Sequence, residues 1–137
     1  MSEPAPIRET VIGNRGADHV LINAWGKPNL EGWFSAEVKI ACEGWRGKFL
    51  CSLQKGELRA LAEELQRLEN SLNGEATFHP LEPNLILAFS GDGKGHINVK
   101  GEAQERLGSG TRLVFEFEID QTYLRSVISD LLIADPA

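Results

Sequence analysis

The sequence has few cysteines and no long apolar run. Its two cysteines, Cys42 and Cys51, are too few for the disulfide framework of a small secreted protein. No stretch approaches the ~18 consecutive apolar residues that cross a bilayer, and the first six residues lack the basic start and apolar stretch of a secretory signal. These absences predict a soluble, cytoplasmic protein with no membrane partner.

The neighbourhood of the two cysteines offers no metal-ligand spacing. In a hairpin that turns near Arg46-Gly47, Cys42 and Cys51 would lie almost opposite each other. Because a reducing compartment keeps thiols reduced, we expect small buried thiols, with a regulatory disulfide as the alternative.

Positive charge is also scarce. The chain has 14 Lys and Arg against 20 Asp and Glu, which gives a net charge of −6 and a pI near 5.1. Proteins that bind nucleic acids or anionic membranes usually carry clustered Lys and Arg. The balance therefore predicts no nucleic-acid partner and favours a basic protein as the partner.

Local catalytic and metal-binding patterns are missing as well. The histidines His19, His79 and His96 lie far apart, and none belongs to a spacing that would place two metal ligands on one face. No serine lies in a Gly-x-Ser-x-Gly turn. Gly91-Asp-Gly-Lys-Gly95 resembles a phosphate loop, but a strand-like segment follows it, so we predict a hairpin turn. We expect no catalytic residues, no metal, no cofactor and no enzymatic activity.

The first half of the chain contains strand patterns. Residues 1–10 have two prolines and no period, and we predict a loose lead-in there. Residues 18–25 form the first predicted strand. A hairpin with Trp45 at its tip follows, because apolar residues recur at every second position at Phe34, Ala36, Val38, Ile40 and Cys42, and again at Phe49, Cys51 and Leu53.

A leucine stripe predicts a helix over about 55–72. The leucines recur at intervals of three and four and share one face: Leu58, Leu61, Leu65, Leu68 and Leu72. Asn73-Gly74 is a typical left-handed stop. A coiled-coil seam is the alternative reading of the stripe, but it covers barely two heptads between strands, so docking onto the domain's own sheet is favoured.

The second half repeats this order. Strands are predicted at 76–78, 85–89, 97–103 and 112–119, separated by proline and glycine loops. Asp120 can cap a helix over about 121–133 that ends before Asp135-Pro136. The fold class is therefore α+β: a single domain over residues 1–137 with a mainly antiparallel sheet and two helices packed on one face.

The opposite face of that sheet is the candidate binding surface. Trp25, Trp33 and Trp45 lie at or beside turns, where a tryptophan can cap the core or anchor a partner. The predicted partner-binding residues are Trp33, Glu37, Glu102, Glu116 and Glu118. The alternative for these charges is a merely solvated face.

Several sequence segments between about residues 33 and 133 resemble those of the WapI-type immunity proteins. They are Trp45-Arg-Gly-Lys-Phe49 with Cys51, the leucine helix ending Leu72-Asn-Gly74, Gly95-His-Ile-Asn-Val99, and Phe117-Glu-Ile-Asp-Gln-Thr-Tyr-Leu124. The resemblance implies a small cytoplasmic bacterial protein that binds and neutralises a cognate domain of a contact-dependent polymorphic toxin. An orphan protein-interaction domain and a small-ligand binder are the alternatives.

Overall fold

The computed structural model of the protein describes residues 6–137, and these residues form eight strands and two α-helices. In chain order the elements are β1 (Arg8–Gly13), β2 (His19–Trp25), β3 (Trp33–Cys42), β4 (Trp45–Gln54), α1 (Glu57–Ser71), β5 (Asn73–Phe78), β6 (Leu85–Asp92), β7 (His96–Gln104), β8 (Arg112–Asp120), a 3₁₀ turn (Gln121–Tyr123) and α2 (Leu124–Ala134). The predicted α+β class and both helices are confirmed. The chain consists of two successive units, each with four strands followed by a helix.

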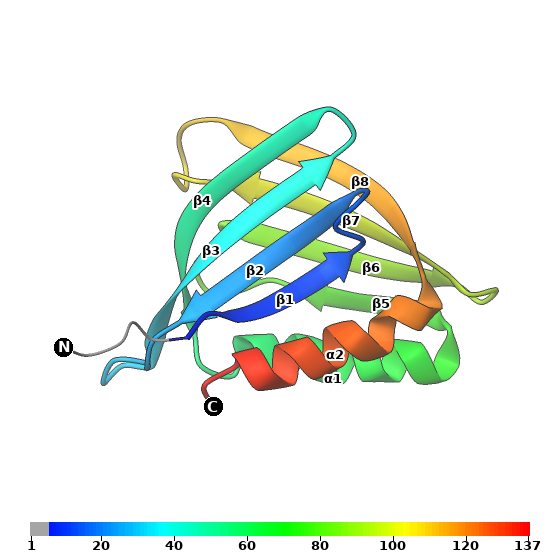
Figure 1. The fold of residues 1–137 in the computed structure, drawn as a ribbon, viewed down its shortest axis with the longest axis horizontal. Coiled ribbons are helices and arrows are strands. Elements are labelled where there is room, and N and C mark those ends of the chain that lie inside the picture. Colours follow the sequence, from blue (N-terminus) through cyan, green and yellow to red (C-terminus); the bar gives the residue numbers. More distant parts are fainter. Residues whose placement is uncertain (1–5) are drawn as a thin grey trace.

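The strands form two antiparallel sheets of four strands, whereas the sequence suggested one. The first sheet has the order β1-β2-β3-β4 and the second β5-β6-β7-β8, so every strand pairs with its neighbour in sequence. Figure 1 shows the first sheet in front of the second. Apolar residues at alternate positions of both sheets join one hydrophobic core, including Ile22, Val38, Phe49, Leu87, Val99 and Phe117. Each sheet therefore covers the apolar face of the other.

The two helices lie side by side on one side of the molecule (Figure 1). Helix α1 packs along β5 of the second sheet, and α2 packs along β1 of the first. The leucine stripe is confirmed as part of the protein's own core, because four of its five members are buried: Leu58, Leu61, Leu65 and Leu68. Each unit thus supplies the helix that packs beside the first strand of the other unit.

Helix α1 ends one residue before the predicted stop. Leu72, not Asn73, has the left-handed conformation (φ 58°), and its N–H donates to the Leu68 carbonyl at 2.7 Å. A left-handed residue with a side chain costs about 1–2 kcal/mol. The Leu72 carbonyl accepts the N–H of Gly93 at 2.8 Å, which ties the helix end to the β6–β7 turn and offsets that cost.

The loose lead-in predicted for residues 1–10 is wrong for its last residues. Residues 1–5 lie outside the described part, but Arg8 begins β1, which pairs with β2. The Arg8 side chain donates to the carbonyls of Ala134 at 2.9 Å and Gly26 at 3.1 Å. Because these contacts are distant in sequence, the local composition gave no sign of them.

The β3–β4 hairpin turns at Glu43-Gly44, earlier than predicted. In its register Cys51 lies opposite Ala36, and Cys42 lies opposite Trp45. The two cysteines are therefore not opposite each other, and both are free thiols. Trp45 stands beside the turn, as expected, and is 68% exposed.

Aspartates cap the 3₁₀ turn before α2 and the N-terminus of α1. The Asp120 carboxylate accepts the Thr122 N–H at 2.9 Å, as predicted, and this bond lowers the pKa of Asp120. Asp135 caps α1 from far along the chain: it accepts the N–H of Gly56 at 2.8 Å and of Arg59 at 2.8 Å. Gly56 has no side chain that could do so, and a carboxylate at a helix N-terminus also interacts favourably with the helix dipole.

Replacing Leu65 with alanine tests the role of the leucine stripe. Leu65 is fully buried, so Leu65→Ala is expected to lower the free energy of unfolding by about 2–5 kcal/mol in urea. The matched control is Leu81→Ala, because Leu81 is 75% exposed and its truncation should change stability by less than ~0.5 kcal/mol. Equal effects of the two changes would contradict the assignment of the stripe to the core.

Candidate functional site

The predicted partner-binding residues lie on the outer faces of two different sheets. Trp33 and Glu37 belong to β3 and lie on the outer face of the first sheet. Glu102, Glu116 and Glu118 belong to β7 and β8 and lie on the outer face of the second. Because the inner faces of the sheets meet in the core, these outer faces point in opposite directions. The structure therefore brings together only the last three.

The outer face of the second sheet is predominantly acidic. We define the acidic face by its carboxylates, which come from all four strands: Glu75, Asp92, Glu102, Glu116, Glu118 and Asp120. Two of them have a lysine or an arginine beside them, since Arg112 lies 4.0 Å from Glu102 and Lys100 lies opposite Glu116. Glu118 instead lies opposite the neutral Asn98. Three of the carboxylates, Asp92, Glu118 and Asp120, lie towards the β6–β7 turn, where Lys94 and His96 are the basic residues.

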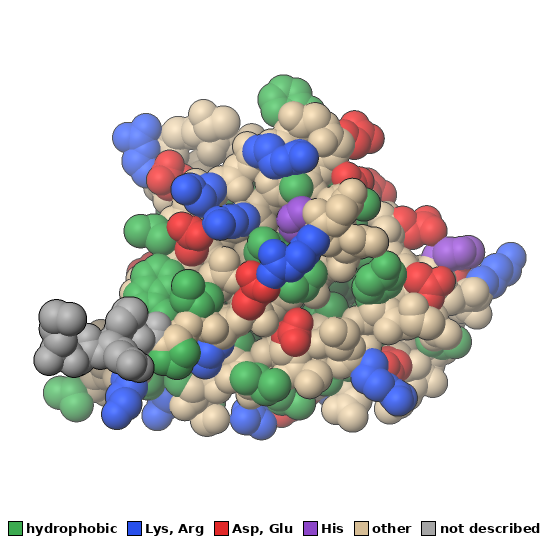
Figure 2. Space-filling view, in the orientation of Figure 1, with side chains coloured by type: hydrophobic (Ala, Val, Ile, Leu, Met, Phe, Trp, Pro, Cys, Tyr) green, Lys and Arg blue, Asp and Glu red, His purple; other side chains and the backbone are tan. Residues whose placement is uncertain are grey.

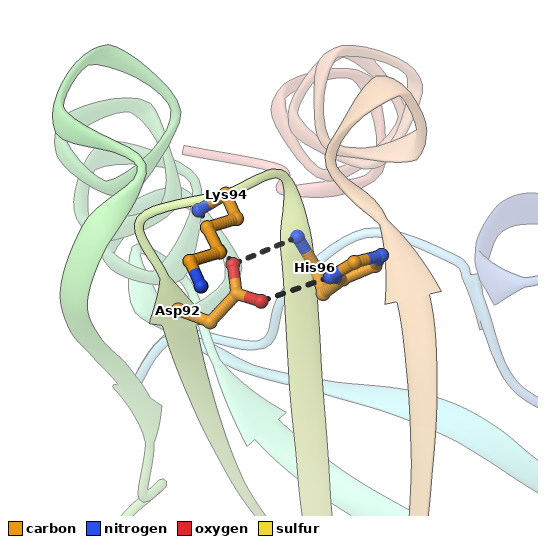
Figure 3. A network of polar contacts seen from close by, with 3 residues as sticks. All are labelled: Asp92, Lys94 and His96. Carbon is orange, nitrogen blue, oxygen red and sulfur yellow. Dashed lines mark hydrogen bonds and ion pairs between the residues drawn. The ribbon is translucent and has the colours of Figure 1, made fainter.

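That turn is built around Asp92. Asp92 Oδ1 accepts the N–H of Lys94 at 2.6 Å and of His96 at 3.1 Å, and Oδ2 lies 2.9 Å from His96 Nδ1 (Figure 3). These bonds, that from the Lys94 N–H foremost, lower the pKa of Asp92 to about 2. The expected hairpin turn is confirmed. The carboxylate of Asp92 occupies backbone N–H groups that a phosphate loop would offer to a ligand.

His96 reports the electrostatic potential of the acidic face. Its pKa is raised, first by the hydrogen bond with Asp92 and then by the negative charges of Asp92, Glu118 and Asp120. A cation at this position is therefore stabilised by three carboxylates from two turns and a neighbouring strand. The same potential would favour a lysine or arginine of a partner.

A cleft of about 850 Å³ lies where the β3–β4 hairpin approaches β8. Apolar and aromatic side chains line it, including Trp45, Phe49, Leu113 and Phe115, together with Arg46, Arg106 and Arg112. The Cys42 thiol bridges the two sheets here by donating to the Glu116 carbonyl at 3.5 Å. Sequence reasoning missed this cleft because it depends on how the two sheets approach each other. The exposed Trp45 was its one visible sign.

Among residues 6–137, the structure gives little support for a metal site or for a nucleophilic thiol. No group of three or more His, Cys, Asp or Glu side chains there is arranged to hold a metal ion. Burial, foremost, raises the pKa of the Cys51 thiol to about 11, and burial likewise raises the pKa of Cys42. A protonated thiol is a poor nucleophile at neutral pH.

Membrane insertion has no helical candidate either. Within the described part of the chain, neither helix combines the length and the apolar character that crossing a bilayer requires.

The fold and this surface define a small α+β protein with two antiparallel sheets and one acidic sheet face. The chain belongs to the immunity protein WapI-like family, whose sequence profile matches residues 16–132. The resemblance noted in the sequence is thereby confirmed. No curated protein is similar enough in sequence to count as a relative.

Among solved structures, the crystal structures of Trypanosoma brucei MRP1/MRP2 are similar to this chain. The likeness covers 93% of this chain and 84% of that chain, with 12% sequence identity and a TM-score of 0.41. At that distance, nothing about function is transferred from it.

The pKa of His96 tests whether the acidic face has a negative electrostatic potential. We expect NMR to give a pKa for His96 above the ordinary value of 6.5, because Asp92 and its neighbours stabilise the protonated ring. The pair then stabilises the fold fully between pH 3.8 and 6.5, and this contribution is lost as the pH rises through the raised pKa of His96 or falls through the lowered pKa of Asp92. Asp92→Asn should lower the pKa most, and Glu118→Gln by a smaller amount.

The matched control is Glu37→Gln, since Glu37 lies on the other sheet and should leave the pKa of His96 unchanged. A wild-type pKa at or below 6.5 would contradict the proposed field.

Proposed function

We propose that this protein neutralises a cognate toxin domain by binding it through the acidic face, without turnover or cofactor. The carrying observation is the acidic excess on the outer face of the second sheet in a member of an immunity protein family. A net charge of −6 supports a basic partner, because opposite charges accelerate encounter and fix orientation. We further propose that neutralisation takes place in the bacterial cytoplasm.

The proposed mechanism is stoichiometric occlusion. Glu116 and Glu118 are exposed and lie two residues apart on an edge strand, so both are accessible to a docking surface. Glu102 is partly neutralised by Arg112 and is assigned a peripheral contact. A toxin domain seated on this face would have its active site or its substrate channel covered.

Trp33 and Glu37 are assigned a smaller part. Glu37 lies 3.7 Å from Lys39, which reduces its attraction for a distant cation. Both residues also face away from the acidic face. Charge reversal at Glu37 therefore provides a control for the binding site proposed on the second sheet.

The second candidate is a small-ligand-binding or orphan interaction domain. The cleft of about 850 Å³ favours it, because its volume lies within the range of small-molecule sites and aromatic side chains line it. The two candidates differ in what co-purifies with the protein.

The first experiment is affinity purification of the tagged protein from its native host, followed by mass spectrometry. We expect near-equal recovery of the toxin domain of a large secreted protein, and co-expression of that domain with this protein should restore growth. Repeated recovery of no protein while the toxin is expressed would reject the immunity proposal in favour of the second candidate.

Charge reversal on the acidic face should slow association with that toxin domain. The double variant Glu116→Lys/Glu118→Lys is expected to reduce the association rate constant about tenfold or more at low salt, with less difference at high salt. Thermal stability should change little, because both side chains are exposed. Stopped-flow or surface-binding kinetics at several salt concentrations measure this.

The matched control is Glu31→Lys/Glu37→Lys, which makes the same change in net charge on the side of the first sheet. It should slow association much less than the double variant on the acidic face. Equal slowing by both would show that net charge alone steers the encounter and would contradict the assignment of the face.

A further inference from the structure

The first sheet carries a basic hollow on its outer face. This hollow has a volume of about 410 Å³. We define the basic hollow by four basic side chains and a histidine that line it: Arg15, His19, Lys39, Arg46 and Lys48. Leu21, Ile40, Ala41 and Gly47 complete the lining, and no acidic residue contributes to it. Figure 2 shows Lys and Arg side chains gathered around a histidine over this sheet. In a chain of net charge −6, this local excess of positive charge is exceptional.

The positive charges of the basic hollow repel one another. Lys39 and Lys48 lie directly opposite in the register of β3 and β4, an arrangement of like charges that destabilises a sheet. Arg46 precedes Lys48 by two residues in β4 and therefore lies on the same face of the sheet. Glu37 and Glu9 relieve the repulsion only in part, through ion pairs with Lys39 and Arg15. Repulsion between like charges that lowers stability, with no compensating contact in the protein, is typical of a binding surface.

One exposed apolar side chain, Leu50, lies beside the hollow on the same sheet face. Leu50 comes two residues after Lys48 on the same face of β4, and its side chain is 62% exposed. Exposed apolar side chains near arginine are a feature of protein interfaces. Since β4 is at the edge of its sheet, an extended segment can also lie along it.

We propose that the basic hollow binds an acidic segment of a protein partner. Carboxylates of the segment pair with Arg46, Lys39 and Lys48, and an apolar residue of the segment contacts Leu50. This surface is distinct from the acidic face and goes beyond the proposed function, because it does not require that the partner be a toxin.

A short acidic segment fits the charges better than a nucleic acid. At 0.1 M salt the Debye length is about 10 Å, so a segment confined to the hollow is screened from the acidic face on the other sheet. A long polyanion would extend beyond the hollow and meet the negative surface of the remaining chain.

The test uses the full-length protein and a fluorescein-labelled peptide of alternating glutamate and valine, followed by fluorescence anisotropy at low and moderate salt. We expect saturable, salt-sensitive binding, weakened about tenfold or more by Lys39→Glu/Lys48→Glu. The matched control, Lys27→Glu/Lys55→Glu, makes the same charge change at exposed positions beyond the opposite end of the hairpin and should leave binding within about twofold.

Thermal melting establishes that each variant is folded, and Lys48→Gln, which removes one charge without reversing it, should give an intermediate loss. A peptide of alternating lysine and valine should not bind at the hollow. Equal binding by the wild-type protein and Lys39→Glu/Lys48→Glu would overturn the proposal. Stronger binding of a single-stranded oligonucleotide or of inorganic phosphate than of the acidic peptide would also overturn it.

Discussion

The structure depends on one constraint: each of the two sheets has an apolar face that the other sheet and the two helices must cover together. Residues of both inner faces form a single core, and the two helices complete it beside β1 and β5. Within the second sheet, the Phe115 ring lies over Gly101, its partner in the β7–β8 register, where a Cβ atom would clash with the ring. Phe115 itself stacks on Phe117, with ring centroids 6.3 Å apart. Because the inner faces are committed to this core, the charged residues of the two sheets must point to opposite sides of the molecule.

Opposite outer faces give the protein two surfaces of unlike charge. The second sheet presents carboxylates around His96, whereas the first presents Lys39, Arg46 and Lys48. Composition alone shows only the sum of these, a net charge of −6. A partner with a matching distribution of charge would be oriented as well as attracted, because the wrong orientation would bring like charges together. Affinity and orientation would then come from different sheets.

Local patterns predicted most of the elements but not how they associate. Alternation identified the inward residues of β3 and β8, and the leucine stripe identified α1, because each depends on a period within one element. Period alone does not say which strands share a sheet, so Glu37 and Glu116 were assigned to one face although they lie on two. Strand β1 was missed because the Arg8 contacts that hold it come from Gly26 and Ala134. The acidic face was partly foreseen; the cleft and the basic hollow depend on tertiary arrangement.

The cap that Asp135 provides for α1 also sets an order of events during synthesis. Gly56 and Asp135 are separated by 79 positions in the chain. At ribosomal speeds of 5–20 residues per second, the carboxylate is made roughly 4–16 s after the amide that it will accept. During that interval α1 lacks its acceptor, and β1 lacks the α2 helix that packs along it. The apolar surface of the first unit therefore stays incompletely buried until the second unit has been translated.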